Sequence, residues 1–512
     1  MDAGGRQTGG LRAGAELPGG SDGTAYSPLM ASSRSTLARL RTRPVPTWWR
    51  DAKLGIFVHW TPASIPAFAP TAGDYGGLLT SGRADAFAFS PYVEWYENSL
   101  RFPDSPAARH HRAVWRNRPY RSFAADFEAG LDQWDPEEWA ACFAATGARY
   151  VVLVSKHADG WCLWPSTVPN PHLPGWHSRR DLIGELADAV RSHGMKFGVY
   201  YSGGLDSTFR EFPMGSMGGV LAAIPRGDYP AYAEAQVREL IERYRPSVLW
   251  NDIAWPAPGK DLWPLIDHYY RVVPEGVIND RWMPWSPLLA MARNGKGRRL
   301  IDGLSARQSR SDGGLVPPKP PLFGYRTPEY MTFDDVQQTP WECVRGMDKS
   351  FGYNAESTEE DFLTRDELLW STTDIVSKGG NLLLNVGPRA VDAQIPHEQL
   401  ERLGWLAGYL PPNGHAVFGT RPWSTPGAAT VQGDPLRYTA RDDKVFAFVR
   451  STRPVATLAD VVPTASTTVR GTDGLVLDWS HDASGLQVTL PPAANGDPVV
   501  VVLGHVDARG QP

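Results

Sequence analysis

The chain has 512 residues, more than a single hydrophobic core ordinarily takes, so we expect a large domain with a smaller companion. Its formal net charge of −5, without a run of five or six like charges, argues against nucleic acid and against an anionic membrane surface as partners. No stretch approaches the roughly 20 apolar residues that a membrane-spanning helix needs, so no membrane partner is expected.

The N-terminal residues 1–44 are rich in Gly, Ala, Arg and Ser, and they lack the apolar stretch of a secretory signal. We predict a flexible tail there. The three cysteines, Cys142, Cys162 and Cys343, form an odd and sparse set without metal-ligand spacing, which argues against a disulfide framework. A reducing compartment and a cytoplasmic location are therefore expected.

Residues 45–414 alternate short apolar strands with amphipathic helices, the pattern of a parallel sheet in either a barrel or a doubly wound fold. The first clear helix, 135–148, has Asp135 as its N-cap and Pro136 at its first helical position. Further on, Thr364 and Glu367 form a capping box before a helix that ends at 378. The other predicted elements are strand 150–154, helix 182–192, strand 195–201, helix 232–244, strands 247–250 and 276–278, strand 381–386 and helix 397–410.

Two regions depart from this pattern. Residues 283–321 are rich in Arg, Gly, Ser and Pro without periodicity, so we expect a long, mobile excursion from the first domain. Residues 415–512 change to alternating strands, including 444–450, 485–490 and 499–503, separated by turn residues. This pattern predicts a C-terminal antiparallel β-sandwich.

Polar side chains follow the predicted strands of the first domain. Asp252 ends an apolar strand among apolar neighbours, where a carboxylate loses solvation, so its expected role is chemistry on a bound ligand, as a nucleophile. The carboxyl ends of barrel strands form one active face. Any one such residue could be structural, but their repeated position predicts a shared site built from His59-Trp60, Ser155-Lys156-His157, Tyr200-Tyr201, Asn251-Asp252 and Asn279-Asp280-Arg281.

Cleavage of a glycosidic bond needs two carboxyl groups, one to attack or guide water and one to protonate the leaving oxygen. Asp252 supplies the first, and Glu94, Glu329 and Glu342 are candidates for the second, because a Glu among aromatic or apolar neighbours can have a raised pKa. Spacing does not choose among them. The histidines lack metal-ligand spacing and no phosphate-cradling glycine motif occurs, so neither a metal nor a nucleotide cofactor is expected.

At these residues the chain resembles the family 29 glycoside hydrolases, the retaining α-L-fucosidases, over about residues 45–420. The motifs occur in family order: KLGIFVHW at 53–60, EWY at 94–96, KHADG at 156–160, GVYYS at 198–202, LWND at 249–252, NDRW at 279–282, WE at 341–342 and GGNLLLNVGP at 379–388. The resemblance implies an irregular (β/α)8-like barrel followed by a β-sandwich. It also implies exo-acting hydrolysis of terminal α-L-fucosides by double displacement, with a fucosylated glycan or glycoside as partner and no cofactor. The sequence allows a homo-oligomer but does not determine the oligomeric state.

The same resemblance implies roles for individual residues. Asp252 matches the family's nucleophile, Glu329 matches the acid/base of bacterial members, and Glu342 is the alternative favoured from animal members. The excursion at 283–321 is expected above the same face, at the leaving-group site. The expected sugar contacts are His59, Glu94, Trp95, His157, Tyr201, Trp250, Arg281 and Phe351, the last packing on the fucose methyl group.

One position departs from the family motif, because Ala158 stands where a second histidine is usual. A sugar hydroxyl thereby loses a hydrogen-bond partner, at a cost of about 1 to 3 kcal/mol in a desolvated pocket. Either Asp159, Trp161 or a water replaces the imidazole, or the pocket takes another L-sugar. A third alternative is a carbohydrate-binding relative without activity.

Overall fold

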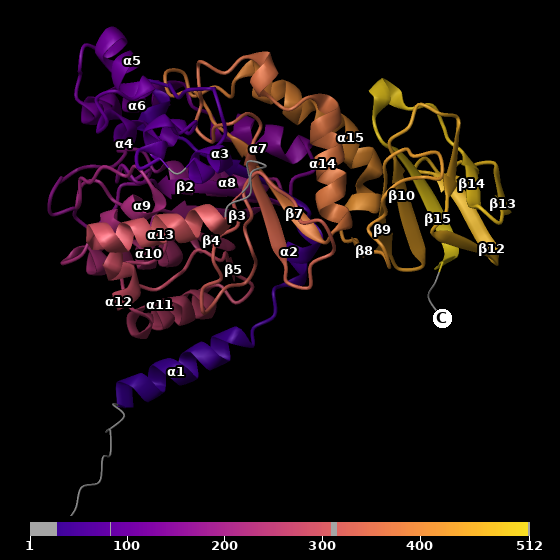
Figure 1. Cartoon of the computed structure of the whole chain (residues 1–512), viewed down its shortest axis with the longest axis horizontal. Helices are drawn as coiled ribbons and strands as arrows, with labels where there is room; N and C mark the ends of the chain where they lie inside the picture. Colours follow the sequence, from indigo (N-terminus) through magenta and orange to yellow (C-terminus); the bar gives the residue numbers. More distant parts are fainter. Residues whose placement is uncertain (1–27, 82, 309–314, 510–512) are drawn as a thin grey trace, which may run out of the picture.

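The computed structural model describes residues 28–81, 83–308 and 315–509. It contains a large α/β domain and a smaller antiparallel domain that packs beside helices α14 and α15 (Figure 1). Within the described residues, no helix is both long and apolar enough to cross a bilayer.

The core of the large domain is a curled sheet of seven parallel strands. In spatial order these are β5 (Val277–Ile278), β4 (Val248–Asn251), β3 (Lys196–Tyr201), β2 (Tyr150–Lys156), β1 (Leu54–Val58), β7 (Gly380–Val386) and β6 (Trp341–Gly346). Every residue of β1, β2 and β7 is buried, which explains why apolar residues predominate in these strands. The barrel-like α/β fold predicted from the sequence is confirmed.

The segment 324–330 fills the gap between the two edge strands of this sheet. Its first residue, Gly324, donates its backbone N–H to Ile278 O on β5 at 3.0 Å. On its other side, Arg326 and Glu329 form parallel bridges with Trp341 and Val344 of β6. Pro328 lacks an N–H and cannot continue a regular ladder. The eighth position of the barrel is therefore irregular, and it carries Glu329.

Helices cover the outside of the sheet, and the five helices that the sequence predicts in this domain correspond to α7, α8, α10, α14 and α15. Thr364 caps α14 in the predicted capping box with Glu367. The last helix, α15, continues through Pro411 and Pro412 beyond its predicted end at 410. The bounds are α2 Thr47–Ala52, α3 Tyr75–Thr80, α4 Tyr96–Leu100, α5 Pro106–Trp115, α6 Phe123–Gly130, α7 Pro136–Ala145, α8 Leu182–Ser192, α9 Met217–Ala223, α10 Tyr229–Tyr244, α11 Gly259–Val272, α14 Arg365–Ser377 and α15 His397–Val417.

Two predicted irregular regions contain helices instead. Helix α1 (Pro28–Arg41) lies within the expected tail, and the ion pair between Arg39 and Asp267, at 2.7 Å, ties it to α11. The excursion contains α12 (Pro287–Ala290) and α13 (Gly295–Gln308). The sequence did not predict these helices, because contacts with the folded body stabilise helices that have weak local signals. Residues 1–27 and 309–314 lie outside the described part.

The C-terminal domain is a sandwich of two antiparallel sheets, as predicted. The first sheet has five strands in the order β12 (Val461–Gly471), β15 (Val499–Ala508), β10 (Lys444–Val449), β9 (Leu436–Arg441) and β8 (Arg421–Pro422). The second sheet has three strands in the order β11 (Val455–Leu458), β14 (Gly485–Thr489) and β13 (Trp479–Asp482). Arg437 of β9 pairs with Asp374 of α14 at 2.5 Å, and Arg365 of α14 pairs with Asp497 at 2.6 Å. These ion pairs attach the sandwich to the large domain.

Candidate active site

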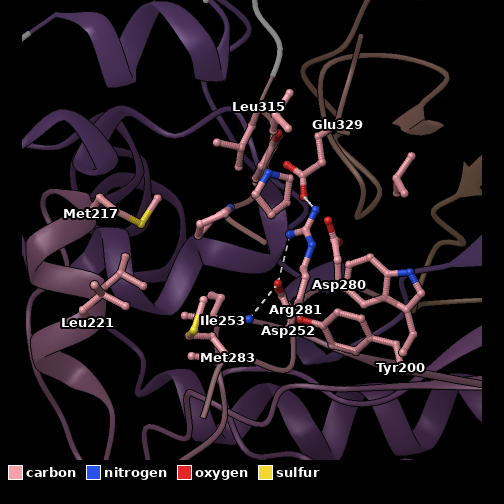
Figure 2. A pocket seen from close by; sticks show the side chains of 18 of the residues that line it. Tyr200, Met217, Leu221, Asp252, Ile253, Asp280, Arg281, Met283, Leu315 and Glu329 are labelled. Atoms are coloured by element: carbon pink, nitrogen blue, oxygen red, sulfur yellow. Dashed lines mark hydrogen bonds and ion pairs between the residues drawn. The ribbon is translucent and has the colours of Figure 1, made fainter. Parts of the chain in front are cut away.

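A cavity of about 370 Å³ opens at the carboxyl ends of the parallel strands (Figure 2). The residues that follow five strands contribute to its lining, as the strand-end argument predicts. These residues are His59 after β1, His157 after β2, Tyr200 on β3, Asp252 after β4, and Asp280 with Arg281 after β5. Nine of the eleven residues to which the family resemblance gives a catalytic or sugar-binding role line this cavity: His59, Glu94, Trp95, His157, Trp250, Asp252, Arg281, Glu329 and Phe351.

Asp252 is held by hydrogen bonds to both of its carboxylate oxygens. The hydroxyl of Tyr200 donates to Oδ2 at 2.9 Å, and Arg281 Nη1 donates to Oδ1 at 3.0 Å. Burial raises the pKa of Tyr200 well above its usual range, so this phenol stays a neutral donor. Three donors, counting the backbone N–H of Ile253 at 2.9 Å from Oδ1, therefore orient one carboxylate at the mouth of the barrel.

The turn after Asp252 has an unusual backbone. Ile253 and Ala254 have φ values of 53° and 65°, in the left-handed region that non-glycine residues seldom occupy. Asn251 holds the turn by donating its side-chain amide to Ala254 O at 2.8 Å. Gly204 lies so close that a Cβ there would come within 1.6 Å of Ile253 O. The strained turn directs Ile253 into the cavity beside the carboxylate.

Glu329 lies at the same mouth, on the segment that closes the barrel. Arg281 Nη2 lies 2.6 Å from its Oε1, so one guanidinium contacts both carboxylates (Figure 2). Burial is the main influence on the pKa of Glu329 and raises it, while the positive charge of Arg281 opposes that rise. A raised pKa favours the protonated form, which a general acid needs.

Arg281 itself is fixed from three sides. Its Nε donates to Thr327 Oγ1 at 3.1 Å, and its guanidinium lies 4.7 Å from the centre of a Trp250 ring. The neighbouring carboxylates raise the pKa of Arg281 against the effect of burial, so the guanidinium stays charged.

Glu342 does not line the cavity. It lies on β6, is fully buried, and accepts a hydrogen bond from the hydroxyl of Tyr150. Burial raises its pKa to about 8, so the sequence argument for a raised pKa holds for Glu342 as well. Its position is what separates it from Glu329, since only Glu329 faces the cavity that Asp252 faces.

Two histidines form part of the cavity wall. His59 Nδ1 lies 2.6 Å from Asn385 Oδ1, and the His157 ring stacks on Tyr200 with an interplanar angle of 7°. Burial lowers the pKa of each histidine to about 3, so both are neutral at physiological pH. Phe351 packs 5.0 Å from the His59 ring and adds an apolar face. Neutral imidazoles beside aromatic faces suit an uncharged sugar.

Glu94 contributes a further carboxyl group to this wall. The backbone N–H of Gly352 donates to its Oε2 at 3.0 Å. Burial raises the pKa of Glu94 to about 8, so its carboxyl group is mainly protonated at neutral pH and is able to donate a hydrogen bond to a ligand hydroxyl.

Tyr201 lies outside the cavity, in contrast to the prediction. Its hydroxyl donates to Gln236 Oε1 at 3.0 Å, and Lys156 Nζ lies 4.6 Å from its ring centre. Tyr200 occupies the cavity wall instead, because successive side chains of a strand point to opposite faces. Its partner in the parallel register is Trp250, which also lines the cavity. The register between β3 and β4 therefore identifies Tyr200 as the cavity residue. The sequence of two adjacent tyrosines does not show which of them faces the cavity.

Ala158 lines a separate recess of about 20 Å³ that shares Glu94 and Trp95 with the main cavity. Neither proposed substitute for the missing imidazole lines the main cavity. Asp159 accepts hydrogen bonds from the Tyr120 hydroxyl at 2.8 Å and from the Trp161 backbone N–H at 3.1 Å. A recess of this size has room for one water. Of the three replacements considered for the missing imidazole, a water is the one that this geometry favours.

Further cavity residues come from α9, which the sequence did not single out, and from residues 283–305 and 315–318, and most are aliphatic. The last two groups belong to the excursion 283–321 that was expected at this face. Within the described residues, no cluster of three or more His, Cys, Asp or Glu side chains forms a metal site.

Comparison with known proteins agrees with this geometry. A family model described as Alpha-L-fucosidase matches residues 28–415. An α-L-fucosidase of Branchiostoma floridae is 29% identical over 477 residues, covering 89% of this chain and 91% of that protein. The tissue α-L-fucosidase of Rattus norvegicus is 28% identical over 483 residues, covering 89% of this chain and 88% of that protein.

Solved structures give the same result. The crystal structure of Thermotoga maritima α-fucosidase in complex with fucose has a TM-score of 0.74 and 34% identity, covering 91% of this chain and 98% of that chain. With a family match over most of its length and a barrel mouth where one guanidinium contacts two carboxyl groups, this chain belongs to the α-L-fucosidase family of glycoside hydrolases.

Proposed function

We propose that the protein is an exo-acting, retaining α-L-fucosidase that uses Asp252 as nucleophile and Glu329 as acid/base. The observation that carries this proposal is the contact of both carboxyl groups with the one guanidinium of Arg281. A retaining pair stands about 5 to 5.5 Å apart. Groups that bind the two terminal nitrogens of one guanidinium lie close enough together for that chemistry.

The reaction has two displacements. Asp252 attacks the anomeric carbon while Glu329 gives its proton to the departing oxygen, which leaves as an alcohol. Glu329, now a carboxylate, then takes a proton from water, and the water oxygen attacks the same carbon and releases Asp252. Two inversions give net retention of the anomeric configuration.

The sugar side of the cavity supports a fucoside as substrate. The crystal structure of the Thermotoga maritima relative contains fucose. In this chain, neutral His59 and His157 and the carboxyl group of Glu94 present polar atoms, and Phe351 presents an apolar face beside them. This combination matches a sugar that carries hydroxyl groups and one methyl group.

A second candidate function is the hydrolysis of another L-sugar glycoside by the same mechanism. The recess beside Ala158 favours this alternative, because it offers space next to Glu94 and Trp95 for a sugar substituent that fucose lacks. A panel of aryl L-glycosides decides between the two, since this alternative requires another glycoside to have a higher kcat/KM than the L-fucoside.

The central experiment compares wild type with Asp252→Ala on 4-nitrophenyl α-L-fucoside, with NMR of the first anomer released. Hydrolysis with retention by wild type, its loss in the variant, and partial rescue of the variant by azide would support the proposal. An Asp252→Ala variant that keeps most of its activity would remove Asp252 as nucleophile. A folded wild type that binds fucose and hydrolyses no activated glycoside would instead indicate a binding protein.

A further inference from the structure

Part of the cavity lining is an apolar wall. We use this name for Met217 and Leu221 of α9, Met283, Leu289 of α12, Ile301 of α13, and Leu315. In Figure 2, Met217 and Leu221 lie across the cavity from Tyr200, Arg281 and Glu329. Met217 and Leu221 of the apolar wall therefore lie on a different side of the cavity from Arg281 and Glu329.

The wall begins directly beside the proposed acid/base. The backbone N–H of Leu315 donates to Glu329 O at 3.1 Å, and the N–H of Glu329 donates to Leu315 O at 2.8 Å. The oxygen that Glu329 protonates must lie within hydrogen-bond reach of its carboxyl group. The group attached to that oxygen consequently starts next to Leu315 and extends along the wall.

The wall offers few partners for hydroxyl groups. Among the described cavity residues from α9, 283–305 and 315–318, only Ser286 and Ser305 have polar side chains, and none is charged, aromatic or an amide. A sugar as leaving group would bury several hydroxyl groups here. Each buried hydroxyl without a partner lowers affinity by roughly tenfold or more.

Close helix packing holds the wall in place. Asp302 of α13 accepts hydrogen bonds from the Ser216 hydroxyl at 3.1 Å and from the Gly218 backbone N–H at 2.7 Å, at the start of α9. At Gly218 the helices are so close that a Cβ would come within 2.8 Å of Arg298 O. The apolar residues of α9 and α13 are thus held on a fixed support, as a binding subsite requires.

We propose that the leaving-group subsite of this enzyme takes an apolar aglycone, an alkyl or aryl alcohol, in preference to a second sugar. This inference rests on the proposed fucosidase function and specifies its substrate class. Burial of each aglycone methylene against the wall is worth about a fourfold gain in kcat/KM when the contact is kept in the transition state.

The test uses three α-L-fucosides below any micellar concentration: methyl, octyl, and a triethylene glycol monomethyl ether of similar length to octyl. We expect kcat/KM for the octyl fucoside to exceed that for the methyl fucoside by about tenfold or more, and the glycol fucoside to resemble the methyl one. Equal values for all three, or a preference for the glycol, would overturn the inference.

α-L-Fucosyl fluoride separates this inference from the proposed function, since its leaving group is too small to contact the wall. Turnover of the fluoride without an octyl preference would reject the apolar subsite and retain the fucosidase. Absence of fluoride turnover by folded protein would reject the fucosidase itself.

A matched pair of variants on α13 locates the subsite. Ile301→Asn places an amide in the wall, whereas Leu304→Asn makes the same kind of change at a side chain that is 50% exposed and does not line the cavity. We expect the octyl-to-methyl ratio of kcat/KM to fall several-fold in Ile301→Asn and to stay at the wild-type value in Leu304→Asn. Equal ratios in both variants would place the aglycone elsewhere.

Discussion

Arg281 Nη2 lies 2.6 Å from Glu329 Oε1, and the two side chains are only 9% and 10% exposed. The other terminal nitrogen of the same guanidinium lies 3.0 Å from Asp252 Oδ1. A single cation therefore acts on both proposed catalytic groups. It keeps burial from raising the pKa of Glu329 further, and it donates a hydrogen bond to Asp252.

Arg281→Gln should move the pH profile. Because the general acid works in its protonated form, activity falls as pH rises through the pKa of Glu329. Removal of the cation raises that pKa further, so the alkaline limb of kcat/KM should move to higher pH. Loss of a charge-assisted hydrogen bond to the nucleophile should also lower kcat/KM by about tenfold to a hundredfold.

The control for this prediction is Arg345→Gln. Arg345 lies over the Tyr330 ring at 5.7 Å and does not line the cavity, so its loss removes a nearby charge without a contact to either carboxyl group. An alkaline limb that moves equally in both variants, or in neither, would contradict the role given to Arg281.

Tyr200→Phe and Tyr201→Phe should have different effects although the residues are adjacent. The first removes the hydroxyl that donates to Asp252, so kcat/KM should fall by about tenfold to a hundredfold. The second removes a hydrogen bond to Gln236 outside the cavity, so it should lower the free energy of unfolding by about 1 kcal/mol with little change in kcat/KM. Kinetics and denaturant unfolding of both variants provide the test, and a greater kinetic loss in Tyr201→Phe would reverse the assignment.

Glu329→Gln should separate substrates by the acidity of their leaving groups. Methyl α-L-fucoside needs a proton on its departing oxygen, so its kcat/KM should fall by about a hundredfold to ten-thousandfold. 2,4-Dinitrophenyl α-L-fucoside leaves as a stable anion, so its first displacement should be much less affected. Glu342→Gln is the matched control outside the cavity, and a selective loss of methyl fucoside hydrolysis in that variant would make Glu342 the acid.

Glu342→Gln should also change how stability depends on pH. In the folded protein burial raises the pKa of Glu342 to about 8, above the usual 4.5. Its contribution to stability is therefore complete below pH 4.5 and is lost as pH rises toward 8, because the unfolded chain releases the proton first. Between these values the wild type should lose up to about 1.4 kcal/mol per pH unit relative to the variant. Chemical unfolding of both proteins at pH 5 and pH 7.5 measures this difference, and identical changes in the two proteins would contradict it.

Local sequence signals determined much of the framework. The apolar run Leu54–Val58 predicts a buried parallel strand, since both faces of such a sheet are covered. Thr364 and Glu367 start α14 as predicted, because a capping box involves only residues three apart. Asp252 could be recognised at a strand end because an ionisable group after an apolar strand is unusual and costly. Its resemblance to a family motif pointed to the same residue.

Tertiary structure decided what depends on residues far apart in the chain. It selected Tyr200 over Tyr201 through the pleat of β3 and its register with β4. It placed Glu329 in the cavity and Glu342 outside it, although burial raises the pKa of both groups. It also formed α13 where the sequence lacks periodicity, because packing against α9 supplies the stabilisation that local propensity does not. The face of a strand that meets the cavity, the closure of the barrel and the packing of one helix on another all depend on contacts between residues far apart in the chain. Composition and local spacing do not determine these contacts.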